Sequence, residues 1–237
     1  RNLATLTGDG IAVVGPVNGA MACGEFGPGR LTEVPDIIGA IDAHFSDGPL
    51  KGRHALVTSG PTHEPIDPVR YIANRSSGTQ GTAIAAALRD LGARVTFVTG
   101  PADTSPPAGI DVVRVETAQQ MLNAVTAALP ADVAIMAAAV ADWRVENAGD
   151  RKMKKDGSAT APALTFAENP DILATVSKAA TRPKLVVGFA AETDDVIANA
   201  TAKRLRKGCD WIVANDVSPG TGIMGGTENA VTLITDI

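Results

Sequence analysis

A polar stretch early in the chain holds side chains that could bind a phosphate or a carboxylate. Thr62–Arg75 carries Asp67, Arg70 and Asn74, and Ser76-Ser77-Gly78 then opens the next predicted helix. Unpaired backbone N–H groups and the positive end of the dipole at a helix start attract anions. Strand-to-helix connections of this length are usually functional or disordered. The stretch predicts either an anion-binding site or, equally, a surface loop in which Ser76 or Ser77 only caps the helix.

Two further segments combine a predicted strand end with charged residues. The apolar run Val133–Val140 is typical of a buried parallel strand, and it ends just before Asp142. Its residues Ala137–Ala139 could let a flat ring approach the backbone, or could simply pack under a helix. The cationic run Arg151–Lys155 is either a solvated face or a loop that closes over a polyphosphate.

A helix start and a pair of lysines complete the candidate groups. Asn169 and Pro170 predict a helix N-terminus, with Asn169 as the cap. Lys203 and Lys207 are four residues apart, so they share one face of a later helix. The chain contains neither G-x-x-x-x-G-K-[ST] nor G-x-G-x-x-G. A bound nucleotide must therefore be held by another arrangement.

The segments between these groups alternate between strand and helix patterns. The predicted strands include 55–58, 111–116, 133–140, 184–189, 211–214 and 229–237, and the predicted helices include 82–91, 121–129 and 194–207. This alternation predicts an α/β fold with a doubly wound, mostly parallel, Rossmann-like sheet and helices on both faces. In such sheets the carboxyl ends of the strands face the ligand crevice.

The beginning of the chain differs in pattern from the rest. We expect a unit at 1–45, a linker rich in turn residues at 46–52, and a main domain at 53–237. Within the first unit, Ile11–Val14 predicts a strand and Pro35–Phe45 a short amphipathic helix. Cys23 lies in a glycine-rich loop, where it is either a small buried residue or a proton donor or nucleophile.

Composition limits the class of protein. The 237 residues are 45% apolar with a net charge of −5, which predicts a globular protein and argues against a general nucleic-acid binder. Two cysteines and three histidines are too few and too scattered for a disulfide framework or a zinc site. No apolar run is close to the length of a membrane span, about 18 residues. We expect a cytoplasmic protein. Because the sequence starts at Arg1 without Met, we expect a piece of a longer chain.

Five segments at predicted strand ends and helix starts together resemble bacterial phosphopantothenate–cysteine ligases. They are the loop with Asn74, then AAAVADWR, KMKK, NPDIL, and GFAAET followed by KRLRK. The likeness runs from about Gly52 to the end of the sequence, and no single short motif carries it. It implies the ligase half of the bifunctional coenzyme A biosynthesis proteins.

The resemblance implies a reaction in two steps. The carboxylate of 4'-phosphopantothenate attacks the α-phosphate of CTP, with Mg²⁺ offsetting charge, and pyrophosphate leaves an acyl-cytidylate behind. The amine of L-cysteine then displaces CMP and forms the amide. The resemblance alone implies CTP in preference to ATP.

Site residues carry over from the resemblance position by position. Asn74 would orient the acyl-cytidylate, Arg70 would contact the phosphopantothenate, and Lys152 would meet the phosphates and assist the first step. The implied nucleotide-binding residues are Met136, Ala137, Ala138, Asp142, Lys152, Pro170, Asp171, Ile172, Leu173, Phe189, Lys203 and Lys207. Asp142 and Asp171 are candidate metal ligands, although the triphosphate and water could hold the ion.

The ACGE-GPGR spelling around Cys23 resembles the closing segment of flavin-dependent phosphopantothenoylcysteine decarboxylases, in which the matching cysteine is the proton donor. It covers about the first 35 residues. The FMN-binding part would lie upstream, so we expect no decarboxylation from this piece. The resemblance also implies a homodimer, in which the loop Asp67–Arg70 reaches the neighbouring site, and a larger assembly through the decarboxylase half.

Two other hypotheses stay open. A Rossmann-type oxidoreductase or nucleotide-sensing module would bind NAD(P)H and ignore CTP, although the missing G-x-G-x-x-G counts against it. The piece could instead act mainly in assembly, in which case its size in solution would depend on residues 1–45.

Overall fold

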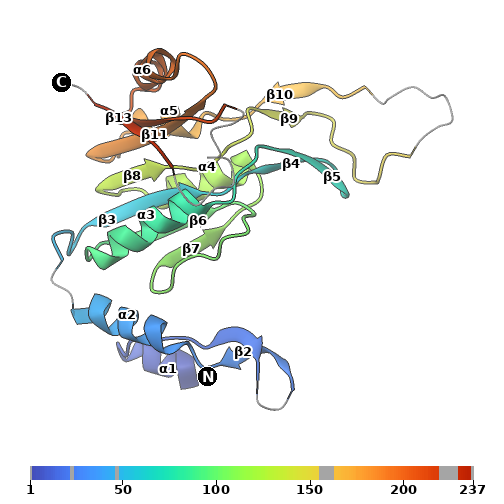
Figure 1. The fold of residues 1–237 in the computed structure, drawn as a ribbon. Helices are drawn as coiled ribbons and strands as arrows, with labels where there is room; N and C mark the ends of the chain where they lie inside the picture. The colour runs from blue at the N-terminus through green and yellow to red at the C-terminus, as the bar shows by residue number, and fades with distance from the viewer. Residues whose placement is uncertain (1, 22–23, 46–47, 155–162, 219–228, 236–237) are drawn as a thin grey trace.

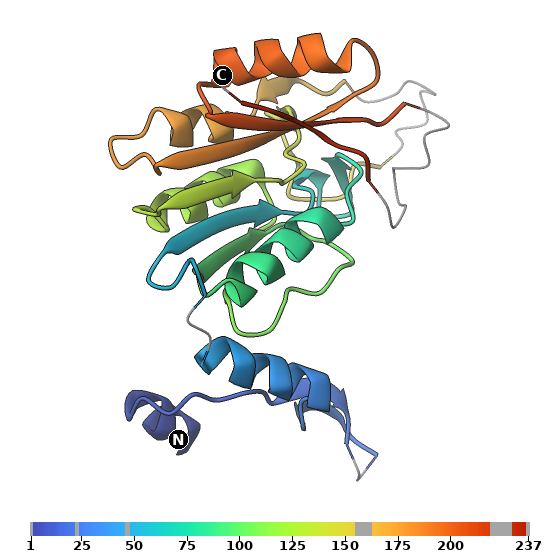
Figure 2. The same ribbon diagram turned by 60° about the vertical axis from the view of Figure 1, so that its left-hand side comes forward.

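A seven-stranded sheet forms the body of the molecule in the computed structural model, which describes residues 2–21, 24–45, 48–154, 163–218 and 229–235. The strand order is β13-β12-β11-β8-β3-β6-β7 (Figures 1 and 2). Its strands are β3 (His54–Ser59), β6 (Arg94–Thr99), β7 (Asp111–Arg114), β8 (Val133–Met136), β11 (Leu185–Glu192), β12 (Trp211–Asp216) and β13 (Thr232–Ile234). All neighbouring pairs are parallel except β12–β13. The predicted doubly wound, mostly parallel sheet is confirmed.

Helices cover both faces of the sheet because successive strand residues point to opposite sides. They are α3 (Thr79–Asp90), α4 (Ala118–Ala127), α5 (Ile172–Ser177) and α6 (Val196–Lys207). Leu56 packs with residues of α4 and α5, whereas its neighbours Ala55 and Val57 pack on the opposite side with Ala85 of α3. Helix α6 packs on β11 and β12 through Ala200. The near-continuous apolar strands of the sequence are therefore buried on two faces.

Two hairpins project from the carboxyl edge of the sheet, and the sequence predicted neither of them (Figure 1). The stretch expected as one long loop contains β4 (His63–Asp67) and β5 (Arg70–Ala73), an antiparallel pair. Farther along, β9 (Trp143–Val145) pairs with β10 (Phe166–Glu168). We call these two hairpins, together with residues 146–154, the arm.

The predicted strand 133–140 is too long. β8 ends at Met136, where the Thr58 carbonyl of β3 accepts a last ladder bond from Ala137 N–H at 3.2 Å and the Thr58 hydroxyl then accepts from Ala138 N–H at 3.2 Å. Pairing resumes only as an isolated parallel bridge between Ala139 and Pro61. Thr62 Oγ1 then accepts from Ala141 N–H at 3.0 Å. The chain leaves the sheet in a conformation fixed by two buried threonines.

The first 45 residues form a small group of elements beside the body (Figure 2). They are α1 (Asn2–Gly8), β1 (Val17–Ala20), β2 (Phe26–Arg30) and α2 (Val34–Phe45). The predicted helix at 35–45 is confirmed, whereas the predicted strand Ile11–Val14 is wrong. Cys23 lies outside the described residues, so its predicted role stays a prediction. Within the described ranges, every helix is too short or too polar to cross a membrane.

Candidate functional site

A cleft of about 780 Å³ opens where β3, β8 and β11 end, between the start of α5 and the side of α6. This is the edge at which open α/β sheets bind ligands. Ten of the twelve residues predicted to bind a nucleotide line it: Met136, Ala138, Asp142, Pro170, Asp171, Ile172, Leu173, Phe189, Lys203 and Lys207. They come from four separate stretches of chain. Ala137 and Lys152 are not among its lining residues.

Helix α6 turns a basic face toward the cleft. Lys203, Arg206 and Lys207 recur at helical spacing and all line it. Burial lowers the pKa of the Lys203 ammonium, and nearby Glu192 opposes that shift. A ligand that brought negative charge to this face would relieve the cost of holding cations there. Arg206 was missed in the sequence, although it stands within the KRLRK stretch three residues after Lys203.

The start of α5 is capped by Asp171, and the prediction of Asn169 as cap is wrong. Asp171 Oδ1 accepts from Ala174 N–H at 3.0 Å, and its other oxygen pairs with the Lys207 ammonium. Burial would raise the pKa of the Asp171 carboxyl, but the hydrogen bonds from Lys207 and Ala174 outweigh it and lower the pKa. The carboxylate therefore stays charged and fixes Lys207 at the cleft.

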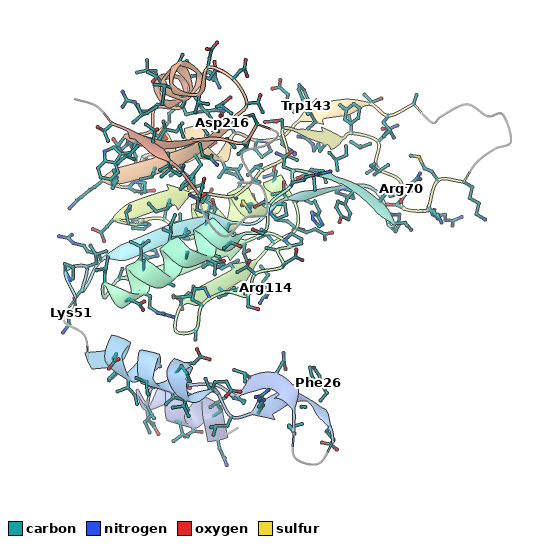
Figure 3. All side chains as sticks on the ribbon, viewed as in Figure 1. Phe26, Lys51, Arg70, Arg114, Trp143 and Asp216 are labelled. Atoms are coloured by element: carbon teal, nitrogen blue, oxygen red, sulfur yellow. The ribbon has the colours of Figure 1, made fainter. Side chains whose placement is uncertain are left out.

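Asn169 instead fixes the wall of the cleft. Its side-chain N–H donates to Ala141 O and its backbone N–H to Asp142 O, both at 2.9 Å. Asp142 and Trp143, which follow Ala141 in the sequence, line the cleft. Trp143 is half exposed and is labelled in Figure 3. The position of Asp142 thus depends on this asparagine from a distant part of the chain.

A second, smaller hollow of about 470 Å³ lies beside the first, at the root of the β4–β5 hairpin. His63 and Tyr71 stack in it with ring centroids 3.8 Å apart. Asn74 also lines the smaller hollow, and its side-chain N–H donates at 3.0 Å to the carbonyl oxygen of Val140, which lines the larger cleft. Asn74 therefore stands at the boundary between the two hollows.

Ser76 and Ser77 do not cap α3. The cap is Gly78, in the left-handed region at φ 76°, without a side-chain hydrogen bond. A Cβ there would come within 2.9 Å of Ala102 Cβ, so glycine is required by space as well as by φ. Ser76 Oγ accepts from Gly78 N–H at 3.3 Å. The surface-cap interpretation is therefore wrong in its details, and the predicted anion site stays a prediction.

Arg70 and Lys152 both lie on the arm, away from the lining of either hollow. Figure 3 shows Arg70 toward the far end of the β4–β5 hairpin, next to the segment that follows β9. The Arg70 guanidinium pairs with Asp67 and also donates to Met153 O at 3.3 Å. Lys152 is exposed and directly precedes Met153.

Metal ligation by a protein cluster finds no support in the described part of the chain, where no three His, Cys, Asp or Glu side chains gather. Asp171 is engaged by Lys207, and Asp142 has no acidic partner in such a cluster. The predicted binding of Mg²⁺, whether through Asp142 and Asp171 or through ligand phosphates and water, therefore stays a prediction.

Comparison with known proteins connects this architecture to one family. Residues 50–237 match the DFP family, described as the C-terminal domain of DNA/pantothenate metabolism flavoproteins. The coenzyme A biosynthesis bifunctional protein CoaBC of Vibrio vulnificus is 42% identical over 234 residues, 98% of this chain and 58% of that protein. The CoaBC proteins of Escherichia coli K12 and Bacillus subtilis are 43% and 40% identical, with the same two coverages. The chain thus spans 58% of the length of these relatives.

Solved structures agree with these relatives. The crystal structure of the C-terminal domain of CoaBC superimposes with a TM-score of 0.64 at 38% identity, covering 78% of this chain and 83% of that one. The DNA/pantothenate metabolism flavoprotein of Streptococcus pneumoniae also reaches 0.64, at 22% identity over 78% of this chain and 93% of its own, and shows the fold alone. With a sheet, a cleft and a sequence match that all span the same residues, this chain belongs to the DFP family of DNA/pantothenate metabolism flavoprotein C-terminal domains.

Proposed function

We propose that this chain is a CTP-dependent phosphopantothenate–cysteine ligase, the ligase half of a bifunctional coenzyme A biosynthesis protein. The observation that carries the proposal is the cleft, in which residues from four distant stretches meet beside the basic face of α6. The relatives named for coenzyme A biosynthesis support the same activity. A protein of the same fold, Cab2, has been solved with phosphopantothenate-cysteine, although at 16% identity it shares only the fold.

The first step is the attack of the phosphopantothenate carboxylate on the α-phosphate of CTP. Lys203, Arg206 and Lys207 would hold the triphosphate, because charge-assisted hydrogen bonds from such side chains bind phosphate oxygens strongly. A bound Mg²⁺ would offset charge between phosphate oxygens. Lys152 would approach from the arm and stabilise the charge that develops as pyrophosphate leaves. The carboxylate is converted in this way from a poor electrophile into a mixed anhydride.

The second step is the attack of the cysteine amine on that anhydride, with CMP as the leaving group. Asn74 is suited to orient the acyl group because its amide is held at the boundary of the two hollows by Val140 O. The larger hollow would hold the cytidylate and the smaller one the pantothenoyl part. In this arrangement the reacting carbonyl lies beside Asn74.

A homodimer would complete the site. The arm leaves Val69, Tyr71, Trp143 and Phe166 more than half exposed, and a second copy of the chain would cover such side chains. We propose that Arg70 of one subunit serves the phosphopantothenate bound in the other. Mixing Asn74→Ala and Arg70→Gln chains, each strongly impaired alone, should then restore about a quarter of the activity, because half of the random dimers hold one intact site. No recovery on mixing would place Arg70 in its own subunit's site.

Product formation is the direct test of the activity. The protein is incubated with CTP, Mg²⁺, 4'-phosphopantothenate and L-cysteine, and pyrophosphate, CMP and 4'-phosphopantothenoylcysteine are measured. Omission of phosphopantothenate should abolish pyrophosphate release. Binding of NAD(P)H with no response to CTP would overturn the proposal in favour of an oxidoreductase or sensing module. Replacement of CTP by ATP in the same assay tests the nucleotide preference.

The parent protein would also decarboxylate the product. Cys23 would donate the proton there, and FMN would bind in an upstream half outside this sequence. A longer chain that includes that half should release CO₂ from phosphopantothenoylcysteine and form the decarboxylated product, and Cys23→Ser should suppress formation of this product because the proton is donated after CO₂ has left. Its larger assembly would be measured by light scattering of the longer chain.

A further inference from the structure

One carboxylate connects the parts of the arm. The Asp67 side chain is 0% exposed, although it lies in a projecting hairpin whose Arg70 side chain is 45% exposed. It accepts hydrogen bonds from five N–H donors, three on the backbone and two on a guanidinium. An ionised carboxylate offers about four lone-pair sites, so the acceptor capacity of this group is fully used.

The first oxygen of Asp67 fixes the hairpin turn. Oδ1 accepts from Val69 N–H at 2.9 Å and from Arg70 N–H at 3.0 Å. Pro68, between Asp67 and Val69, has a restricted φ and supplies no N–H, which suits a turn closed by an aspartate side chain. Asp67 therefore fixes the backbone position of Arg70 independently of the contacts that the Arg70 side chain makes.

The second oxygen joins the turn to a segment more than eighty residues away. Oδ2 accepts from Arg70 Nε at 3.1 Å and from Met153 N–H at 3.1 Å. Arg70 Nη2 in turn donates to Met153 O. Both backbone groups of Met153 are thus engaged, and Lys152 is the residue directly before it. A further bond, from Gly149 N–H to Ile66 O at 2.9 Å, holds the same segment against β4.

An ordinary surface ion pair would not carry much weight, because exposed pairs contribute little. Asp67 differs because its carboxylate is buried and accepts from three residues in two separate parts of the chain. The Arg70 guanidinium, helped by the backbone N–H groups of Val69, Met153 and Arg70, holds the pKa of the Asp67 carboxyl far below its usual range despite burial. The charge is therefore present at every pH at which the protein would work.

We infer that Asp67 is a positioning residue that locks Arg70 and the segment carrying Lys152 into one unit, so that both side chains meet the substrate together. The inference rests on the proposed function, in which Arg70 contacts phosphopantothenate and Lys152 assists the first step. Asp67 itself touches neither hollow. Its loss should disturb two functional side chains at once and leave nucleotide binding in the cleft intact.

Asp67→Asn is the sharpest variant. It keeps the size of the side chain and one acceptor oxygen, but it turns an N–H₂ group toward donors that need an acceptor. We expect kcat/KM for phosphopantothenate to fall by about 10²-fold, since a misplacement of about 1 Å costs this much. The Kd for CTP should change less than about twofold. Amide exchange at Met153 should become faster.

Asp132→Asn is the matched control. Asp132 also bonds an arginine and a backbone amide, Arg53 at 3.0 Å and His54 N–H at 2.9 Å, but it lies at the amino ends of β3 and β8. It should therefore alter stability without altering kcat/KM. An Asp67→Asn enzyme whose kcat/KM and Met153 exchange both match those of Asp132→Asn would overturn the inference.

A mutant cycle separates positioning from general damage. In an Arg70→Gln, Lys152→Gln background, Asp67→Asn should cost less than about threefold further, because both residues through which it acts are already gone. Equal losses in both backgrounds would overturn the inference. Should Asp67→Asn fail to fold by circular dichroism, Asp67→Glu replaces it with the same expected outcomes, since one extra methylene displaces the oxygens. An unaltered chain without ligase activity would instead refute the proposed function, so the two failures are distinguishable.

Discussion

The cleft and the arm hold their functional side chains in different ways. In the cleft, Met136 ends the buried strand β8, Phe189 lies within β11, and Lys203 stands on a helix packed on the sheet. In the arm, Arg70 and Lys152 lie on short hairpins and an irregular segment fixed by side-chain hydrogen bonds. The core thus supports the cleft directly, whereas the arm depends on a few polar contacts. Nucleotide binding should therefore survive changes that abolish chemistry.

Exposure separates the two regions in the same direction. Lys203 and Lys207 are mostly covered, with Lys207 at 21% side-chain exposure, whereas Val69 and Tyr71 on the arm exceed 50%. A preformed pocket suits a nucleotide that brings its own charge. An open arm suits a substrate or second subunit that arrives later and excludes water as it closes.

The largest effect should come from Asn74, at the junction of the two regions. Asn74→Ala removes the amide held by Val140 O, so the acyl-cytidylate should form but react with cysteine about 10³-fold more slowly, as when a transition-state hydrogen bond is lost. Quenched-flow sampling should detect the accumulated intermediate. A normal turnover rate of the Asn74→Ala variant would contradict the role given to Asn74 at the junction of the cleft and the arm.

A smaller loss is expected for the arm lysine. Lys152→Gln removes a cation that would stabilise the departing pyrophosphate, and pyrophosphate release should slow by about 10²-fold. Because Lys152 does not line the cleft, equilibrium binding of CTP should change little. Lys154→Gln, two residues along the same segment, is the control. Equal defects in the two variants would indicate a general charge effect.

A change on the cleft side should give the opposite kinetic signature. Arg206→Gln removes one charge-assisted contact from the basic face of α6, so the Kd for CTP should rise about tenfold. At saturating CTP the rate should return close to that of the unaltered protein. Lys178→Gln, at the far end of α5, should leave the Kd unchanged. A fall in kcat without a change in Kd would contradict this assignment.

The sequence predicted the sheet well because buried parallel strands are apolar along their whole length, as in β3 and β8. It missed β4 because HEPID is polar, contains a proline, and is held by Glu64, which accepts from Ala118 N–H at 2.8 Å. β9 and β10 are three residues each and pair across a long insertion, so no local pattern reveals them. Nonlocal contacts decided these elements.

The same limit applies to the site. Ten cleft residues were identified from segments at predicted strand ends and their resemblance to a family, because the carboxyl edge gathers those segments. The cap was assigned to Asn169 because that residue also favours capping, whereas its bonds to the backbone at Ala141 and Asp142 leave Asp171 as the cap. The Asp67–Met153 bond crosses two hairpins and has no sequence signature.

The smallest expected effect is a fraction of a proton. Burial lowers the pKa of Lys203 in the free protein, so over a window below its ordinary value near 10.4 a larger part of the population is neutral than in the unfolded chain. Over that window the unfolded chain binds more protons, and the stability of the free protein rises with pH on this account.

A triphosphate beside Lys203 would raise its pKa again, so CTP binding should take up less than one proton. Calorimetry at pH 9 in buffers of different ionisation enthalpy measures this uptake. Lys203→Met should abolish it, whereas Lys152→Gln should not, because that lysine is exposed on the arm. Uptake that persisted without Lys203 would show that the buried charge of the cleft is not what receives the nucleotide.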